Sequence, residues 1–447
     1  MTVGLLPRGP VAQASALVDL AGPFGAVGPP RKVDTRGWMP DECAIFTVPV
    51  GNPSAVTGPF RSSVRLLHGT GRAYGEPDRA RLLAVAEALE RYSGFLIDDK
   101  RLTVATADEL GPAALDLERV PRCSRRELTR PGCPVTDIDK TQPIRWIEAD
   151  DLHTGEQVLV PAVMTFLEFP ERGPENFLIP MSTGCAVHES FEAAAVAAIC
   201  EVIERDAIAL TWLQRLPLPR LDPGCLSAVA QSLIGWCAAR GITSHLFNAT
   251  TDLGIPAVYC LQTTERAPRA AQLVGAACGF DVVSLAEHAL LETMGLRPGI
   301  QGRRRLPRRY TDYQTISDGA AVMAARGKRA AFGFLLDAPD SRPVSRLAAP
   351  DAYSDHDRLG LLLRRLAGCG MTALAVDLTP RELRAAGYTA IRVIIPELQP
   401  MAARPLVAYR RHRRLFTAPG RMGFPALPER QLNPYPQPMA LWHGKPG

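Results

Sequence analysis

The apolar positions along the chain follow two periods, one typical of helices and one typical of strands. Helical spacing predicts helices within 68–94, 182–216, 284–297, 356–368 and 380–387. Short apolar runs bounded by turn residues predict strands within 43–50, 144–152, 157–167, 242–250, 257–264, 372–379 and 389–398. Because the two kinds of element are mixed along the chain, we predict a mixed α/β fold, of the α+β kind, around one large core.

The two ends of the chain differ in composition from its middle. Residues 1–60 are rich in proline and glycine and predict a lead-in of strands and turns that is not an independent domain. The main domain is expected over 61–440, and a polar connection near 335–358 predicts a loop. A proline-rich tail covers 432–447, where Pro434, Pro436 and Pro438 favour an extended polyproline conformation.

Two segments share the pattern E-x-x-E-R near the end of a helix rich in small residues, AEALERYSG (86–94) and CEVIERDA (200–207). Glutamates three residues apart lie on one helical face, so Glu87 pairs with Glu90 and Glu201 with Glu204. The second helix is apolar on all sides, which predicts that its carboxylates are buried. Buried like charges are unfavourable without a cation, and Mg²⁺ is a cation that prefers oxygen ligands. The alternative is that each motif is a solvated face with weak Glu–Arg pairing.

A glycine-rich stretch, HGTGRAYG (68–75), precedes the first of these helices. Its glycines, Gly69, Gly71 and Gly75, could cradle a phosphate at the start of the helix, although such a pattern alone is a weak indication. Beside a magnesium cluster, a phosphate loop would suit ATP binding and phosphoryl transfer.

Composition narrows the classes of protein to consider. With 46% hydrophobic and 22% charged residues, no apolar stretch long enough to span a membrane and no signal peptide, the chain is expected in the cytoplasm. Ten cysteines without a C-x-x-C pattern predict neither a zinc site nor disulfides. The net charge of +5 rests on arginine clusters at 302–310 and 409–416. They lack interleaved aromatic residues, so nucleic acid is not an expected partner, and solvated surface is favoured over a groove for an anionic leader peptide.

Five segments together resemble the YcaO family, over about residues 65–440. They are AEALERYSG, STG…EVIERDA, LAEHALLETMGLR, DLTPRELRAAGYTAIRVIIPELQPM and LNPYPQP. The resemblance implies sheets and helices around a central nucleotide and magnesium cleft. It also implies an enzyme that uses ATP and Mg²⁺ to phosphorylate a peptide amide oxygen after a nucleophile has attacked the carbonyl carbon.

The family pattern can be carried over to individual residues, although it assigns no catalytic residue here. The metal ligands that the resemblance implies are Glu87, Glu90, Glu201 and Glu204. The nucleotide contacts that it implies are Ser182, Thr183, Gly184, Glu292 and Arg297.

The chain departs from the family pattern at positions expected to contact ATP. Leu83, Glu189, Ala193 and His288 stand where the family has serine, asparagine, glutamate and arginine. An arginine replaced by histidine loses a permanent charge and a planar fork that grips phosphate. Thr70 stands where many members have lysine, with Arg72 close by.

The leading hypothesis from the resemblance is cyclodehydration of Cys, Ser or Thr to azolines in a ribosomal precursor peptide. An E1-like or other leader-binding partner protein would present the peptide. A thioamide- or amidine-forming variant and a catalytically degenerate scaffold that binds peptide or a partner are the alternatives. Family members commonly dimerise, so a homodimer is left open.

Overall fold

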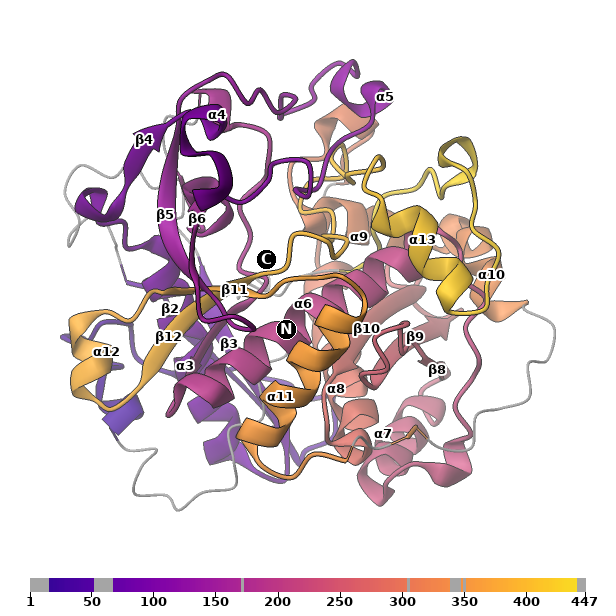
Figure 1. Cartoon of the computed structure of the whole chain (residues 1–447). Coiled ribbons are helices and arrows are strands. Elements are labelled where there is room, and N and C mark those ends of the chain that lie inside the picture. The colour runs from indigo at the N-terminus through magenta and orange to yellow at the C-terminus, as the bar shows by residue number, and fades with distance from the viewer. Residues whose placement is uncertain are drawn as a thin grey trace.

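Three antiparallel sheets and three long helices form the framework of the chain (Figure 1). The computed structural model describes residues 16–51, 67–169, 173–303, 306–337, 347–348 and 351–439. This arrangement confirms the expected mixed α/β class. No helix in the described ranges has both the length and the apolar character needed to cross a bilayer.

The largest sheet has six strands in the order β4-β5-β11-β12-β7, with β6 paired to the other edge of β5. Its strands are β4 (Thr103–Ala105), β5 (Ile144–Asp151), β6 (Gln157–Pro161), β7 (Cys185–His188), β11 (Leu374–Asp377) and β12 (Thr389–Ile394). Two strands from the end of the chain, β11 and β12, therefore lie between β5 and β7, so this sheet forms only when residues far apart in sequence have met.

Two smaller sheets flank the middle of the molecule. One has the order β1-β2-β3, formed by β1 (Arg31–Lys32), β2 (Cys43–Pro49) and β3 (His68–Tyr74). The other has the order β10-β9-β8, formed by β8 (Ile242–Asn248), β9 (Ala257–Thr264) and β10 (Gln272–Cys278). The lead-in expected over 1–60 thus supplies β1 and β2 to a sheet that it shares with β3.

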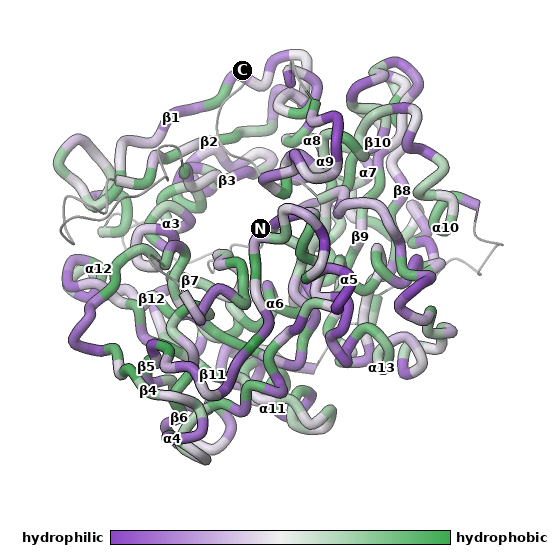
Figure 2. The backbone as a smooth tube through the Cα atoms, turned by 90° about the horizontal axis from the view of Figure 1, so that it is seen from above, coloured by the Kyte–Doolittle hydropathy of each residue, from purple (hydrophilic) through white to green (hydrophobic). Residues whose placement is uncertain are grey.

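The three long helices are α3 (Pro77–Phe95), α6 (Phe191–Leu213) and α8 (Val282–Gln301). The other helices are α4 (Ala107–Leu110), α5 (Arg125–Leu128), α7 (Ala228–Ala238), α9 (Ile316–Ala324), α10 (Gly333–Leu336), α11 (Asp355–Gly368), α12 (Arg381–Ala385) and α13 (Arg414–Arg421). Helix α6 lies centrally, packed against β12 and β7 of the large sheet and against β10 of a small one (Figures 1 and 2).

Glycines let two of the long helices approach their sheets closely. A Cβ atom at Gly71 of β3 would lie 1.9 Å from the carbonyl oxygen of Ala80 in α3. At Gly275 of β10 it would lie 2.4 Å from Oγ1 of Thr293 in α8. Residues 68–74 of the glycine-rich stretch therefore form a strand that packs against a helix, where the sequence suggested a loop.

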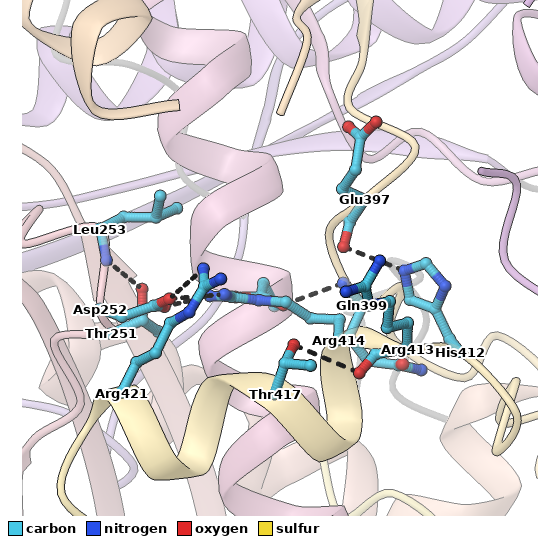
Figure 3. A network of polar contacts seen from close by, with 11 residues as sticks. Thr251, Asp252, Leu253, Glu397, Gln399, His412, Arg413, Arg414, Thr417 and Arg421 are labelled. Atoms are coloured by element: carbon cyan, nitrogen blue, oxygen red, sulfur yellow. Dashed lines mark hydrogen bonds and ion pairs between the residues drawn. The ribbon is translucent and has the colours of Figure 1, made fainter. Parts of the chain in front are cut away.

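The end of α6 is held by a buried ion network (Figure 3). Arg414 at the start of α13 donates to both carboxylate oxygens of Asp206 in α6 and to those of Asp252. Asp206 is 0% and Arg414 3% exposed, so each charge depends on its partner. Because Asp206 directly follows Arg205 in α6, this network also holds Arg205 in position.

The tail packs on the same helix end. The amide of Asn433 donates to the carbonyl of Leu213, and Trp212 Nε1 donates to the carbonyl of Tyr435. Residues 440–447 of the expected tail lie outside the described residues, as do 338–346 and 349–350 of the loop expected near 335–358.

We predict that Gly71→Ala lowers the free energy of unfolding by about 2 to 3 kcal/mol, because the new methyl group forces β3 away from α3. Denaturant unfolding followed by circular dichroism measures the change. Gly235→Ala is the matched control, since Gly235 is helical with nothing within 4 Å of its Cβ position. The control should be neutral or slightly stabilising, and equal stability of the two variants would contradict the prediction.

Candidate functional site

Each of the three long helices carries a buried glutamate that accepts a hydrogen bond from the backbone of the segment before it. The amide of Thr70 donates to Glu87 Oε2, that of Gly184 to Glu201 Oε2 at 3.0 Å, and that of Ala276 to Glu292 Oε2 at 3.0 Å. The three glutamates are 1%, 5% and 7% exposed. The site is thus built three times from the same unit, a strand or turn followed by a helix.

Arginines one helical turn later neutralise two of these carboxylates. Arg91 Nη2 lies 2.7 Å from Glu87 Oε1, and Arg205 Nη2 lies 3.1 Å from Glu201 Oε1. Arg205 Nη1 also lies 2.9 Å from Glu204 Oε1. The E-x-x-E-R motifs are therefore buried ion pairs, which excludes the solvated-face alternative.

Glu90 completes the acidic cluster, which we define as Glu87, Glu90, Glu201 and Glu204 together with Glu292. Burial, followed by repulsion from Glu201 and Glu87, raises the pKa of the Glu90 carboxyl well above its ordinary value. In the described ranges, no three carboxylate, histidine or thiol groups surround one point closely enough to hold a metal ion as they stand. The donor set nevertheless fits Mg²⁺, because it consists of carboxylate oxygens whose mutual repulsion a cation would relieve.

In α8 the position that corresponds to the second glutamate of the E-x-x-E pattern is Gly295, so this helix carries one acid where α3 and α6 carry two. Arg72 of β3 fills the space beside Gly295, since a Cβ atom there would lie 2.9 Å from Arg72 Nε. Burial acts to lower the pKa of Arg72, and the charges of Glu292 and Glu87 oppose this effect. Its Nε is buried and has no hydrogen-bond partner among the described residues. Arg72 thus presents an available donor beside the acidic cluster.

A cleft of about 920 Å³ opens next to Arg72. Its walls include Arg72 and Arg79, His288 of α8, and Tyr353 and Arg358 near the start of α11. The N-cap residues of α3, α8 and α11 (Glu76, Asp281 and Ser354) also line it, so three helix N-termini meet here. Backbone amides at helix N-termini favour anions.

A second, narrow opening adjoins the cluster at Arg205, which lines it and pairs with Glu201 and Glu204. It has a volume of about 90 Å³ and apolar walls that include Met164, Leu178 and Met181. Thr183, Arg205 and Arg392 also line it. Arg392 Nη1 donates to the carbonyl of Met181 at 2.6 Å, and Arg392 is only 8% exposed.

The structure brings most of the expected nucleotide contacts to the cluster. Gly184 donates to Glu201 and has φ of 84°, and its close approach to Val393 leaves no room for a Cβ atom. Thr183 and Ser182 precede it in the same turn. Arg297 lies elsewhere in α8, where it donates to the carbonyl of Ala270 at 2.8 Å and to Gln262 Oε1 at 3.2 Å.

The four departures from the family pattern have structural explanations. Leu83 packs in an apolar cluster of α3. Burial, then the charge of Glu189, raises the pKa of Tyr388 to about 12, so Glu189 is engaged by Tyr388. Ala193 lies in the first turn of α6, capped by Ser190. Burial and then Arg79 lower the pKa of His288 to about 4, so this side chain is neutral at pH 7.

Sequence reasoning named Arg72 but gave it no role, and missed Arg392. For Arg72 a signal existed, because alternation along β3 places Gly69, Gly71 and Ala73 on the helix side and leaves Arg72 facing the other way. Arg392 sits in a strand of apolar residues (TAIRVI), and a lone arginine in such a strand indicates a buried role.

Three antiparallel sheets with three acid-bearing helices define a class of protein built around a buried carboxylate cluster. A family model described as "YcaO cyclodehydratase, ATP- and Mg²⁺-binding" matches residues 70–399. The chain therefore belongs to the YcaO family, as the sequence motifs predicted.

Solved structures share this fold. The chain is similar to a heterocyclase in complex with substrate and cofactor, with a TM-score of 0.77 and 21% identity, over 96% of this chain and 57% of that one. It is also similar to YcaO from Methanopyrus kandleri bound with AMPPCP and Mg²⁺, with a TM-score of 0.59 and 18% identity, over 87% and 89% of the two chains.

Two relatives are more similar in sequence, and both carry the description uncharacterized protein. One from Methanothermobacter thermautotrophicus is 27% identical over 336 residues, 73% of this chain and 80% of that protein. The other, from the tfuA 3′ region of Rhizobium leguminosarum bv. trifolii, is 29% identical over 221 residues, 48% of each chain. The chain thus spans about half the length of the Rhizobium protein and of the heterocyclase.

We predict that Glu90 makes the free energy of unfolding depend on pH. Its pKa in the folded state lies above the ordinary 4.5, so the folded chain binds more protons than the unfolded one above pH 4.5. Stability from this group is therefore present below pH 4.5 and is lost as pH rises through the folded pKa. Glu90→Gln removes this loss. Its free energy of unfolding, compared with that of the parent, should therefore be about 1 to 2 kcal/mol more favourable at pH 8 than at pH 4.5.

Denaturant unfolding at the two pH values, without divalent ions, measures this difference. Glu148→Gln is the control, because Glu148 is an exposed glutamate of β5 outside the cluster. Millimolar MgCl₂ should stabilise the parent at pH 8 and should stabilise Glu90→Gln less. A pH profile that Glu90→Gln leaves unchanged would contradict the prediction.

Proposed function

We propose that this chain is a cytoplasmic, ATP- and Mg²⁺-dependent enzyme that modifies the backbone of a ribosomally made peptide. The reaction we favour is cyclodehydration, in which a Cys, Ser or Thr side chain attacks the preceding carbonyl carbon and an azoline forms. The oxygen leaves as phosphate and ATP becomes ADP. An E1-like or leader-binding partner protein would present the precursor peptide. Family membership and the fold shared with a heterocyclase support this choice.

The observation that carries the proposal is the position of Arg72 between the acidic cluster and the large cleft. In this arrangement Arg72 would bind an anion that enters from the large cleft, and the carboxylates would bind a cation. Arg79 and Arg358 also line the cleft, and each is paired with an acidic residue of the same wall, Glu76 and Asp355. A nucleotide triphosphate with Mg²⁺ on its oxygens matches the combination of the carboxylates and Arg72, whose Nε has no hydrogen-bond partner among the described residues.

Glu87, Glu90, Glu201 and Glu204 would hold Mg²⁺. When bound, Mg²⁺ and ATP supply the electrophilic phosphoryl group that turns the amide oxygen into a leaving group. Arg91 orients Glu87, and Arg205 orients Glu201 and Glu204, through ion pairs. The turn at Ser182, Thr183 and Gly184, together with Glu292, contacts the nucleotide. Arg297, with two of its nitrogens engaged in the core, is assigned no direct contact.

The narrow opening beside Thr183 suits the entry of the peptide. Its apolar walls would exclude water from the reacting amide, and Arg205 at its inner end lies against Glu201. A side chain such as cysteine or serine is small enough for a volume of about 90 Å³. A sulfide or amine nucleophile, giving a thioamide or amidine, would use the same opening.

We predict that Glu201→Gln combined with Glu204→Gln abolishes ATP binding and peptide dehydration, because the cluster loses two of its anionic ligands. Calorimetry with ATP and MgCl₂ and mass spectrometry of the peptide measure the two losses. Glu148→Gln with Glu156→Gln, two exposed glutamates outside the site, is the control. Full dehydration by the cluster variant would overturn the proposal, and the absence of ATP binding in the parent, with the partner present, would favour a scaffold role.

We predict that Arg72→Gln weakens ATP binding by about tenfold to a hundredfold, the usual value of a hydrogen bond to a charged group. Arg72→Lys should recover part of this affinity, because the charge remains while the planar fork is lost. Arg240→Gln, which removes an exposed arginine stacked on Trp236, is the control. Equal ATP affinity of Arg72→Gln and the control would remove Arg72 from the nucleotide site.

A further inference from the structure

A third concave site lies between α5, which is at the top of Figure 1, and the C-terminal segment. We call it the arginine cleft, because Arg126, Arg130, Arg410 and Arg430 line it. Its volume is about 460 Å³, and Pro428 and Pro434 contribute apolar surface. None of its lining residues lines the large cleft or the narrow opening described above.

The four arginines are positioned without carboxylate partners. None of them forms an ion pair with a carboxylate in the described part of the chain, whereas Arg145 and Arg414 lie 2.6 and 2.8 Å from Glu175 and Asp206. Two carboxylates also line the cleft, the exposed Glu429 and the buried Glu127. Glu127 accepts from the backbone amides of Ser124, Ala408 and Arg410, so amide donors already occupy it.

Two of the arginines are held in place by other groups. Arg410 Nη2 donates to the carbonyl of Asn433 at 2.7 Å, and the guanidinium of Arg130 lies 5.1 Å from the ring centre of Tyr310. Burial lowers the pKa of Arg410; the nearby charges of Glu127 and Tyr310 oppose this shift, and those of Arg130 and Arg126 add to it. Fixed cations that repel one another across a cleft favour an anion between them.

The arginine cleft also explains part of the basic sequence clusters. Tyr310 ends the cluster at 302–310, and Arg410 belongs to the cluster at 409–416. Two other arginines of these clusters have different roles, since Arg303 pairs with Asp318 and Arg414 with Asp206. The clusters are therefore not uniform solvated surface.

We propose that the arginine cleft binds an acidic stretch of a peptide through its carboxylates. Arginine forks match carboxylates bidentately, and the proline wall suits an extended chain. A nucleic acid is disfavoured because the Tyr310 ring is covered by Arg130 and offers no face for a base. The proposal rests on the proposed function in one respect, that the peptide is the substrate of the same chain.

The experiment measures anisotropy of a fluorescein-labelled peptide of alternating glutamate and glycine, added to the full chain without ATP or Mg²⁺. The variant is Arg126→Gln with Arg430→Gln, since both arginines are exposed and support no other contact in the described residues. Its Kd should rise about tenfold relative to the parent. The control, Arg81→Gln with Arg381→Gln, removes the same charge at two exposed arginines outside the cleft and should stay within about twofold.

Two further measurements separate the outcomes. Glu201→Gln with Glu204→Gln should bind the peptide normally, so a failure of the proposed catalysis would leave this result intact. A lysine–glycine peptide should not bind. Equal loss of binding in the cleft and control variants would overturn the proposal, as would tighter, cleft-dependent binding of a single-stranded oligonucleotide.

Discussion

The architecture depends on a tie between buried carboxylates and backbone amides. A carboxylate inside a protein is strongly unfavourable unless charge and hydrogen bonds replace its lost water. Here Glu87, Glu201 and Glu292 each obtain an amide donor from the segment that precedes their helix, 17, 17 and 16 residues earlier. Each tie fixes a helix against its own strand or turn, so the register of the core and the position of the acidic groups are set by the same bonds.

This constraint explains why small residues crowd the same region. A glutamate reaches a strand amide only when helix and strand lie close together, which requires Gly69 and Gly71 against α3 and Gly275 against α8. The alanine-rich face of α6 has the same consequence, because Ala194, Ala195 and Ala198 are fully buried. The glycines and alanines of this region thus allow close packing and, by the same means, bring the glutamates within reach of the backbone amides.

The sequence predicted the helices and the E-x-x-E-R acids well, because helical periodicity and burial both mark them. It missed β3, β7 and β10 as strands. They hold many glycine, alanine and cysteine residues and few of the β-branched and aromatic residues by which strands are recognised. It also missed the pairing of Arg91 and Arg205 as a buried feature, because burial of a charge depends on tertiary contacts. The position of Arg297 away from the cluster follows from the helix wheel, as it lies five residues after Glu292.

The arginines within the cluster determine how it can bind a cation. Arg91 pairs with Glu87, whereas Arg205 is shared by Glu201 and Glu204, so a cation would have to compete with two arginines for carboxylate oxygens instead of filling a preformed cage. A cation accompanied by phosphate oxygens competes better than a bare one, because the arginines it displaces can turn to the phosphates. Arg72 is a further cation beside the cluster, and it lines the large cleft. Its Nε donates to no described residue. If the chain binds both, metal and nucleotide binding would be mutually dependent, and Arg72 of β3 would stand in for the family's arginine at the position of His288.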